Sequence, residues 1–388
     1  MPQAGGDERL EDNNIELTVV VPTYNEAENI GALIDRLIEI LDREGPQTYE
    51  VLVVDDNSPD GTCLIVREKA MEYPGKVRCL LRRRGRGLAT AIMRGIYWAR
   101  GRYVVVMDAD FQHPPEIVPK LYWKAVSTGA DIVVASRYRP GGGVEGWSRM
   151  RKLMSKTANL IARILVPNTR KVTDPMSGFF LVRKDIVNLS DLRPRGYKIL
   201  MEIIAKAYSA RIEEVAYTFR NRAGGKSKLG LKTIVDFLLH ALSLSPLVKF
   251  SLVGLLGALI NLGVMSGVLM TGAPLDVASI LGIETGLLFN FFLHEAWTFQ
   301  TKMKGGWKSR LIGYHLASSG GMITNYLVMK GLTLAGIATA LTGQAAGIIA
   351  GFGVNYALSQ SKVWGVDVIE RIKAGEIRKT GRTDKEMH

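Results

Sequence analysis

Two carboxylates, Asp108 and Asp110, lie one residue apart directly after the apolar run of residues 103–107. Gln112 adds an amide oxygen, and His113 adds an imidazole whose role stays open because two prolines follow it. Carboxylate and amide oxygens are ligands that suit Mg²⁺ or Mn²⁺, above all where phosphate oxygens complete the shell. Such an acidic pair is also common where a strand simply leaves the core into a turn. The metal hypothesis therefore depends on the elements around the pair.

Short apolar runs alternate with helical patterns throughout the first half of the chain, which predicts an α/β fold with a mainly parallel sheet. The expected strands are 17–21, 50–54, 77–81, 103–107 and 131–135, and the expected helices are 29–43, 62–73, 88–100 and 116–128. Ligands bind at the carboxyl ends of such strands. This rule selects residues 23–26, Asp55, Asp56, the 108–110 segment and Arg137.

The chain of 388 residues carries a formal net charge of +13, which suits an anionic partner such as a nucleotide, a nucleic acid or an anionic membrane. Basic and aromatic residues do not interleave as in nucleic-acid-binding surfaces, so no nucleic-acid partner is expected. Cys63 and Cys79 show no CxxC spacing. They argue against a disulfide framework and a zinc site, and they fit a reducing compartment.

The second half has the composition of a membrane domain. Four transmembrane helices are expected at 250–275, 277–299, 311–329 and 341–361, and the first contains no charged residue. The loop 301–310 and the tail after 370 are basic, so the positive-inside rule predicts a multi-pass protein with a cytoplasmic N-terminal half and C-terminus. Asparagines recur at a regular offset, Asn261 with Asn325 and Asn290 with Asn355, which predicts two related helical hairpins.

Four motifs occur in order: VVVPTYNEAENI, VLVVDDNSPDGT, GRGLATAIMRGIYWARG and VVVMDADFQHPP. Over residues 16–219 this pattern resembles the family 2 glycosyltransferases, which have the GT-A (Rossmann-like) nucleotide-sugar-binding fold. The resemblance implies a nucleotide-sugar site and a metal site for Mg²⁺ or Mn²⁺. The implied nucleotide-sugar residues are Pro22, Tyr24, Glu26, Val53, Asp55, Asp108 and Ala109, and the implied metal ligands are Asp108, Asp110 and Gln112.

Further stretches, DADFQHPPE, VVASRY, TDPMSGFFLVRK and GYKILMEI, are most similar to polyprenyl-phosphate sugar synthases, above all the dolichyl-phosphate mannose synthases. No QxxRW occurs, which argues against a processive polysaccharide synthase. The four-helix domain resembles small membrane proteins that partner lipid-linked glucosyltransferases. The implied catalytic residues are Asp110, Asp174 and Arg137, and the implied ligands of the acceptor phosphate are Arg137, Arg151, Ser155, Arg222 and Lys228.

The resemblance implies metal-dependent, inverting transfer of one hexose to dolichyl or polyprenyl phosphate, with mannose from GDP-mannose as the leading donor. A phosphate acceptor is already anionic, so it needs positioning and charge screening rather than a general base. Two alternatives stay open. One is glucose transfer from UDP-glucose, and the other is a flippase for lipid-linked sugars that carries a nucleotide-binding domain.

The expected organisation has five parts: a disordered lead-in (1–15), a cytoplasmic catalytic domain (16–228), an interfacial amphipathic helix or linker (229–245), a membrane domain (246–365) and a basic cytoplasmic tail (366–388). A second amphipathic helix is expected at 150–165, where apolar residues form one face and basic residues flank it. It would lie either at the membrane interface or against the core, and the sequence leaves both open.

Overall fold

The computed structural model of the chain describes residues 15–193, 198–207, 209–220, 231–299 and 306–364. The predicted acceptor ligands Arg222 and Lys228, the lead-in and the basic tail lie outside these residues. The chain divides into two compact units, Met1–Ser245 and Pro246–His388. Each unit is described by itself.

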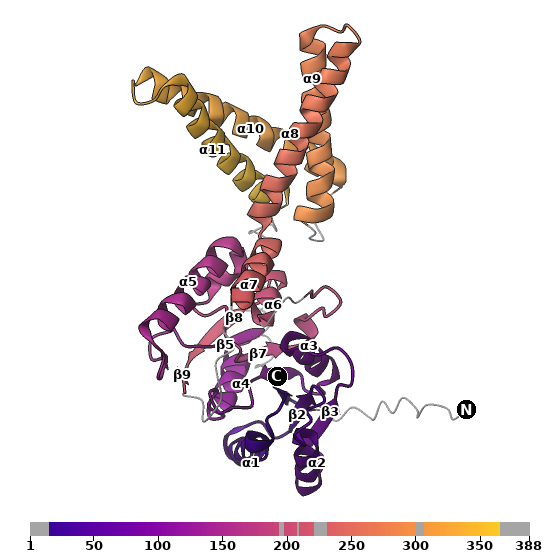
Figure 1. Cartoon of the computed structure of the whole chain (residues 1–388), viewed down its shortest axis with the longest axis vertical. Helices are drawn as coiled ribbons and strands as arrows, with labels where there is room; N and C mark the ends of the chain where they lie inside the picture. The colour runs from indigo at the N-terminus through magenta and orange to yellow at the C-terminus, as the bar shows by residue number, and fades with distance from the viewer. Residues whose placement is uncertain (1–14, 194–197, 208, 221–230, 300–305, 365–388) are drawn as a thin grey trace, which may run out of the picture. The chain divides into compact units, whose positions relative to one another are not determined.

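A mixed sheet forms the centre of the first unit (Figure 1). In the described part of the chain, it has seven strands in the order β3-β2-β1-β4-β7-β5-β8. Their bounds are β1 (Leu17–Thr23), β2 (Tyr49–Asp55), β3 (Val77–Leu81), β4 (Tyr103–Val106), β5 (Ile132–Ser136), β7 (Phe180–Arg183) and β8 (Ile212–Ala216). All neighbouring pairs are parallel except those of β7, which runs antiparallel to β4 and β5. The predicted mainly parallel sheet is confirmed.

Helices cover both faces of this sheet. One core cluster joins α1 (Ala27–Glu44), α2 (Thr62–Glu72) and α4 (Ile117–Thr128) to strand residues such as Val19 and Val21. The opposite cluster joins α3 (Leu88–Trp98) and α6 (Ile199–Lys206) to residues such as Val20. Successive side chains of a strand point to opposite faces. Because both faces are covered, the central strands are apolar without alternation.

The nine strands and helices predicted between residues 17 and 135 lie within about two residues of their expected ends, which is the usual uncertainty of element boundaries. β7 and β8 were not predicted. Neither were the short parallel strands β6 (Gly143–Val144) and β9 (Thr218–Phe219), or the 3₁₀ turns Pro167–Lys171 and Lys184–Ile186. Most of these elements are too short, or in β8 too charged, to give a periodic signal.

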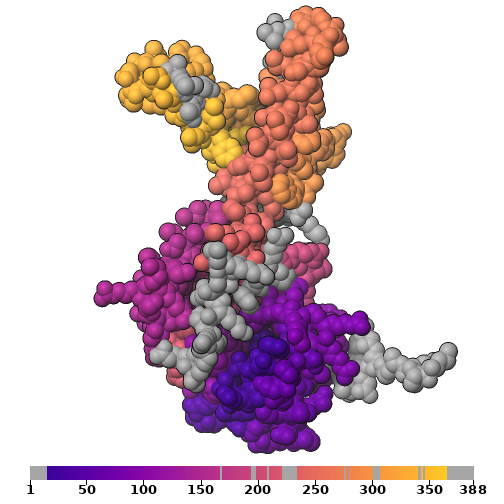
Figure 2. Space-filling model, in the orientation of Figure 1, coloured from indigo at the N-terminus to yellow at the C-terminus, as the bar shows by residue number. Residues whose placement is uncertain are grey.

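Two amphipathic helices, α5 (Arg149–Leu165) and α7 (Leu231–Leu244), pack with α6 in a smaller cluster that includes Ala162, Met201 and Ala241. α5 buries only its small or polar residues Asn159 and Ala162. Its large apolar residues lie mostly on the surface, with exposed fractions of 66% for Met150, 60% for Leu153 and 56% for Leu160. In Figure 2 the magenta atoms of this segment form part of the outer surface of the first unit.

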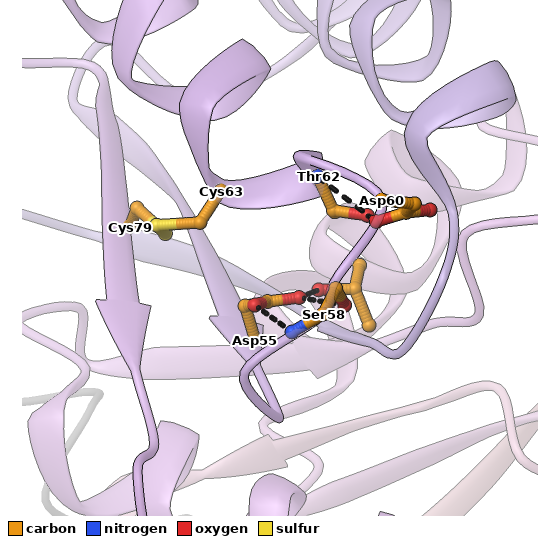
Figure 3. Close-up of a disulfide and its surroundings, with 7 residues drawn as sticks. Asp55, Ser58, Asp60, Thr62, Cys63 and Cys79 are labelled. Carbon is orange, nitrogen blue, oxygen red and sulfur yellow. Dashed lines mark hydrogen bonds between the residues drawn. A yellow bond between two sulfur atoms is a disulfide. The ribbon is translucent and has the colours of Figure 1, made fainter.

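Cys63 at the start of α2 and Cys79 in β3 form a disulfide, with their Cα atoms 6.3 Å apart (Figure 3). This bond was not predicted, because the spacing of the two cysteines along the chain does not indicate a pair. The α2–β3 connection brings residues 16 positions apart into contact. The expectation of a reducing compartment therefore loses the support that it drew from unpaired cysteines.

The second unit is helical, as predicted. Its helices are α8 (Pro246–Met270), α9 (Leu275–Leu293), α10 (Trp307–Leu334) and α11 (Ala340–Leu358); π-helical turns, His294–Thr298 and Ser359–Val363, extend α9 and α11. The predicted first span ran to residue 275, but α8 ends at Met270 because Gly272 adopts a φ of +80° and Pro274 caps α9. Within the described residues, α8 alone is long and apolar enough by composition to cross a membrane.

The helices of the second unit pair as two hairpins, α8 with α9 and α10 with α11 (Figure 1). Close packing in each hairpin joins glycines to asparagines: Gly282 lies against Asn261, and Gly347 lies against Asn325. Gly257 and Gly321 lie in the same way against Asn290 and Asn355. Small residues let helix backbones approach closely, and the matched positions confirm the predicted repeat.

Candidate active site

The carboxyl ends of β1, β2, β4 and β5 lie at one edge of the sheet, because these strands run in the same direction. Three non-glycine residues there have positive φ angles: Asn25 (60°) after β1, Asn57 (57°) after β2 and Phe111 (57°) after β4. In the described residues no other non-glycine residue has one. Asparagine tolerates this conformation but phenylalanine rarely adopts it. Strain concentrated at one edge of a sheet is typical of a functional site.

At the ends of β1 and β2, Asp55 is fully buried and accepts hydrogen bonds from its neighbours. Its carboxylate accepts from Thr23 Oγ1 (2.9 Å), Ser58 Oγ (2.5 Å) and the Ser58 backbone N–H (2.9 Å); Figure 3 shows the bonds to Ser58. Val53 is also fully buried, within the core. Asp55 thus links the ends of β1 and β2 through hydrogen bonds. Its contact with the nucleotide stays a prediction.

Tyr24 and Glu26, also predicted at the nucleotide site, follow β1. Tyr24 is 43% exposed, and the guanidinium of Arg86 lies 5.5 Å from the centre of its ring. Glu26 lines an open pocket of about 610 Å³ together with Asn25, Asn29 and Asp60. Pro22, by contrast, is buried within β1. This end of the sheet therefore offers an aromatic face, a cation and several polar groups to a ligand.

Asp108, Ala109 and Asp110 directly follow β4. The Asp108 side chain is 40% exposed, whereas Asp110 and Ala109 are buried. The Asp110 carboxylate accepts a hydrogen bond from the Gln112 backbone N–H (3.2 Å). Gln112 also donates through its side-chain amide to the carbonyl oxygen of Arg220 (3.2 Å), at the end of the β9 segment. The predicted metal ligands thus lie together in one turn.

His113, whose role the sequence left open, stabilises this turn through a hydrogen bond to its backbone. It is buried, stacks on Phe179 with ring centres 4.9 Å apart, and its Nδ1 accepts a hydrogen bond from the Asp108 backbone N–H (2.9 Å). Burial lowers the pKa of His113 to about 3, although the nearby Asp110 opposes this shift. The ring is therefore neutral at physiological pH and positions Asp108.

Arg137 at the end of β5 and Asp174, both predicted to be catalytic, form a buried ion pair. Arg137 Nε and Nη2 donate to the two carboxylate oxygens at 2.7 and 2.8 Å, and its backbone N–H adds a bond of 3.1 Å. Burial alone would lower the pKa of Arg137, but Asp174 outweighs it and raises the pKa above its ordinary value. Such two-pronged pairing holds the guanidinium in one orientation.

A cavity of about 560 Å³ connects these parts. Its wall includes four predicted site residues: Asp108, Arg137, Arg151 and Ser155. The remaining wall is mainly apolar, and much of it comes from α5, α6 and α7. Arg151 lies over the ring of Trp147, 4.3 Å from its centre. The cavity thus has a charged end beside the sheet and an apolar extension between amphipathic helices.

The donor set at the charged end fits a hard divalent cation only in part. In the described residues, no three His, Cys, Asp or Glu side chains cluster closely enough to hold a metal ion by themselves. Asp108 and Asp110 supply carboxylate oxygens, and Gln112 supplies an amide. Mg²⁺ commonly takes one or two carboxylates and completes its shell with water and substrate phosphates. The residues therefore fit a metal that binds together with a diphosphate.

Among the residues that line this cavity, Lys198 and Trp147 were not predicted as site residues. Lys198 precedes α6, and its Nζ donates to the carbonyl oxygen of Met176 (2.9 Å). Lys198 lies in the GYKILMEI stretch that supports the family resemblance, but that resemblance gave it no role of its own.

Comparison with known proteins agrees with both units. The family described as glycosyl transferase family 2 matches residues 18–189, and the GtrA/DPMS transmembrane domain matches residues 249–364. A dolichol-phosphate mannosyltransferase of Pyrococcus furiosus is 42% identical over 90% of this chain and 99% of its own length. The Saccharomyces cerevisiae protein of the same name is 40% identical over 58% of this chain and 85% of its own length.

Among solved structures, glucosyl-3-phosphoglycerate synthase from Mycobacterium tuberculosis is 21% identical, with a TM-score of 0.43 over 59% of this chain and 78% of that chain. Mannosyl-3-phosphoglycerate synthase from Rubrobacter xylanophilus is 18% identical, with a TM-score of 0.41 over 58% and 72%.

The first unit is thus a GT-A glycosyltransferase domain, and the second is a transmembrane domain that makes the chain a membrane protein. The likeness to the Pyrococcus furiosus protein extends over both units. The chain belongs to the dolichol-phosphate mannosyltransferase family of family 2 glycosyltransferases.

Proposed function

We propose that the chain transfers one mannose from GDP-mannose to dolichyl or a related polyprenyl phosphate, with inversion at the sugar. The observation that supports this proposal most is the cavity, which Asp108 and Arg137 line at one end and whose remaining wall is mainly apolar. A prenyl phosphate has the same division, an anionic head on an apolar chain. The names of the relatives support mannose as the sugar and a dolichyl phosphate as the acceptor.

Each end of the charged region has a separate role in this proposal. Asp108, Asp110 and Gln112 would hold Mg²⁺ or Mn²⁺, which when bound neutralises the charge that develops on the departing diphosphate. Arg137, oriented by Asp174, would hold the acceptor phosphate. A phosphate oxygen is already anionic, so the residues only need to position it opposite the diphosphate, which leads to inversion.

The donor and metal can be tested together. Purified protein in liposomes that contain polyprenyl phosphate is given radiolabelled GDP-mannose, UDP-glucose or another nucleotide sugar, with Mg²⁺, Mn²⁺ or EDTA. Lipid-extractable label is expected with GDP-mannose and a metal, and EDTA should abolish it. If only UDP-glucose gives labelled lipid, the donor is UDP-glucose and not GDP-mannose. If product forms at the same rate in EDTA, the reaction does not require a metal.

Asp108→Asn tests the site within the same assay. Asp108 is partly exposed and follows the strand, so this change removes a charge without opening a core cavity. Lipid product should fall by at least about a hundredfold, as for other losses of transition-state charge stabilisation. Asp185→Asn is the matched control, because the Asp185 side chain is 69% exposed and lines neither pocket. A D108N protein that works at the wild-type rate contradicts the proposed site.

We also propose that all four helices of the second unit cross the membrane and that the catalytic unit is cytoplasmic. The basic connection before α10 supports this orientation, because cytoplasmic loops are rich in Lys and Arg. Cysteines introduced as Ser309→Cys and Thr271→Cys would lie at opposite ends of the helices. In sealed right-side-out cells, an impermeant thiol reagent should label only the cysteine at 271. Labelling at 309 would reverse the topology.

A further inference from the structure

Lys198 lies at the charged end of the cavity that Asp108 and Arg137 also line. The residue is partly buried, and its Nζ donates one hydrogen bond, to the carbonyl oxygen of Met176 at 2.9 Å. A lysine ammonium carries three N–H donors. Two of them are therefore left without an acceptor in the described part of the chain, at the side of a cavity that Arg137 also lines.

The ammonium also lacks a carboxylate partner. Within the described residues, no carboxylate oxygen lies within 4.0 Å of Lys198 Nζ, although other shielded cations of this unit have one. Arg82 pairs with Asp56 at 2.6 Å, and Arg137 pairs with Asp174 at 2.7 Å. A shielded cation without an anion is unfavourable. Its persistence beside a cavity points to an anion that arrives with a ligand.

The charged groups around Lys198 favour the binding of an anion beside its ammonium. Burial, together with the nearby charge of Arg137, lowers the pKa of Lys198 to about 8, although Asp174 and Asp108 oppose this shift. The other titratable or charged residues that line the same cavity are His113, Arg151, Asp236 and His240. Asp174 is already engaged by Arg137. An anion bound between Lys198 and Arg137 would therefore be attracted by both cations.

We propose that Lys198 is a phosphate ligand of this cavity and that its Nζ donates hydrogen bonds to a phosphate oxygen of a substrate. The inference rests on the proposed function, since both substrates of that reaction carry phosphate. The oxygen belongs either to the prenyl phosphate acceptor or to the nucleotide diphosphate. The positive charge of Arg137 is partly neutralised by Asp174. Lys198 would supply additional positive charge to the phosphate.

Binding measurements test this proposal without any turnover. The full-length protein in detergent is titrated with farnesyl phosphate, with farnesol, and with GDP in the presence of Mg²⁺. Lys198→Met should weaken the binding of one phosphate ligand by about ten- to a hundredfold, the usual effect of a hydrogen bond to a charged group. Farnesol binding should stay within about twofold, because the substitution leaves the apolar wall intact.

Lys184→Met is the matched control. Lys184 also donates from a partly buried position to a backbone carbonyl, that of Ala99, and burial lowers its pKa too. It does not line the cavity. All three ligands should bind K184M as they bind the wild type. Thermal unfolding of both variants establishes that they are folded.

A second variant and a pH series distinguish the effect of the Lys198 charge on ligand affinity from the effect of its shape. The wild-type affinity for the phosphate ligand should fall as the pH rises through about 8, where the ammonium loses its proton. Lys198→Arg should restore affinity and remove this fall, because a guanidinium stays charged.

The outcomes distinguish the sources. A loss confined to farnesyl phosphate assigns Lys198 to the acceptor, and a loss confined to GDP assigns it to the donor diphosphate. Equal loss for farnesol and farnesyl phosphate, or no loss in a folded K198M protein, overturns the proposal. Absence of mannose transfer in the wild type, with these binding differences intact, would instead count against the proposed function alone.

Discussion

At the scale of single residues, the ion pair of Arg137 and Asp174 contributes to the stability of the fold and, in the proposed function, to the binding of the acceptor phosphate. Asp174 is fully buried, and it accepts three hydrogen bonds from Arg137. Removal of one partner of a buried pair leaves the other charge uncompensated, whereas replacement of both by apolar residues is often nearly neutral. The two kinds of substitution therefore separate stability from activity.

Asp174→Ala is expected to lower the free energy of unfolding by about 3–5 kcal/mol, the usual cost of breaking a buried pair. The double variant Arg137→Met with Asp174→Leu should recover most of this stability but form no glycosyl lipid. Chemical unfolding in detergent and the radiolabel assay measure the two effects. An active double variant would limit the pair to a structural role.

His113 predicts a dependence of stability on pH. Its pKa is about 3 in the folded protein and about 6.5 in an unfolded chain. The contribution to stability is complete above pH 6.5, and it is lost as the pH falls toward 3, because the unfolded chain then takes up the proton first. From pH 7 to pH 5 the loss from this one group should be about 2 kcal/mol.

His113→Asn checks this prediction, since its amide oxygen can still accept the Asp108 N–H but does not titrate. Unfolding free energies of both proteins are measured at pH 7 and pH 5. The wild type should lose about 2 kcal/mol more than the variant over this interval. Equal losses would show that His113 does not titrate as its burial predicts.

Asp108 and Arg137 could be singled out from the sequence because the ends of strands are easy to recognise. The structure brings them together with Arg151 and Ser155 of α5 around one cavity, and their roles stay predictions. Lys198 could not be found in this way. Its proposed role rests on the absence of a carboxylate near Nζ among the residues that the structure describes. That absence depends on how the chain packs and not on any spacing along the sequence.

At the scale of elements, α5 has the features of a membrane-facing helix. Its apolar side chains are exposed although its polar Asn159 is buried, the reverse of an ordinary surface helix. Of the two interpretations left open by the sequence, an interfacial position agrees better with this pattern. The cavity wall formed by α5 would then open toward the lipid that supplies the acceptor.

Leu153→Glu and Leu160→Glu on α5 are expected to raise the KM for a long-chain polyprenyl phosphate in liposomes by about tenfold, since each charge opposes insertion of the helix into the interface. The KM for the nucleotide sugar and the stability should change little, because both side chains are exposed. Leu64→Glu on α2, at a site 61% exposed, is the control. If L64E has the same effect, the role of α5 is not specific.

Element positions were predictable wherever periodicity was strong, and connections in space were not. The disulfide between Cys63 and Cys79 and the antiparallel insertion of β7 between β4 and β5 both arise from long-range packing. A short strand such as β7 shows only that it is apolar. Its neighbours and direction are determined by the whole sheet.

At the scale of the whole molecule, the membrane unit is organised by a repeat. Phe250, Phe291, Tyr314 and Trp364 form one aromatic cluster to which all four helices or their extensions contribute. Within each hairpin, glycine and asparagine provide the close contacts. The repeat was visible in the sequence because the asparagines are rare enough in apolar segments to be matched.

Gly282→Ala should destabilise the first hairpin. A Cβ atom there would lie 2.5 Å from Asn261 Oδ1 and 2.7 Å from its backbone oxygen, closer than atoms can approach. Gly263→Ala is the control in the same hairpin, since its Cβ would meet nothing within 4 Å. The loss of helical circular dichroism on heating should occur several degrees lower for G282A than for G263A. Equal midpoints would show that the contact is not tight.

The match between Asn261 and Asn325, 64 residues apart, suggests how the domain arose. An ancestral protein with one hairpin would have formed a homodimer through the same aromatic cluster. The assembly of such a dimer depends on the protein concentration. Gene duplication would have placed both copies on one chain. A short tether raises the effective concentration of one hairpin around the other to the order of millimolar. Assembly of the membrane unit thus no longer depends on how much protein the cell makes.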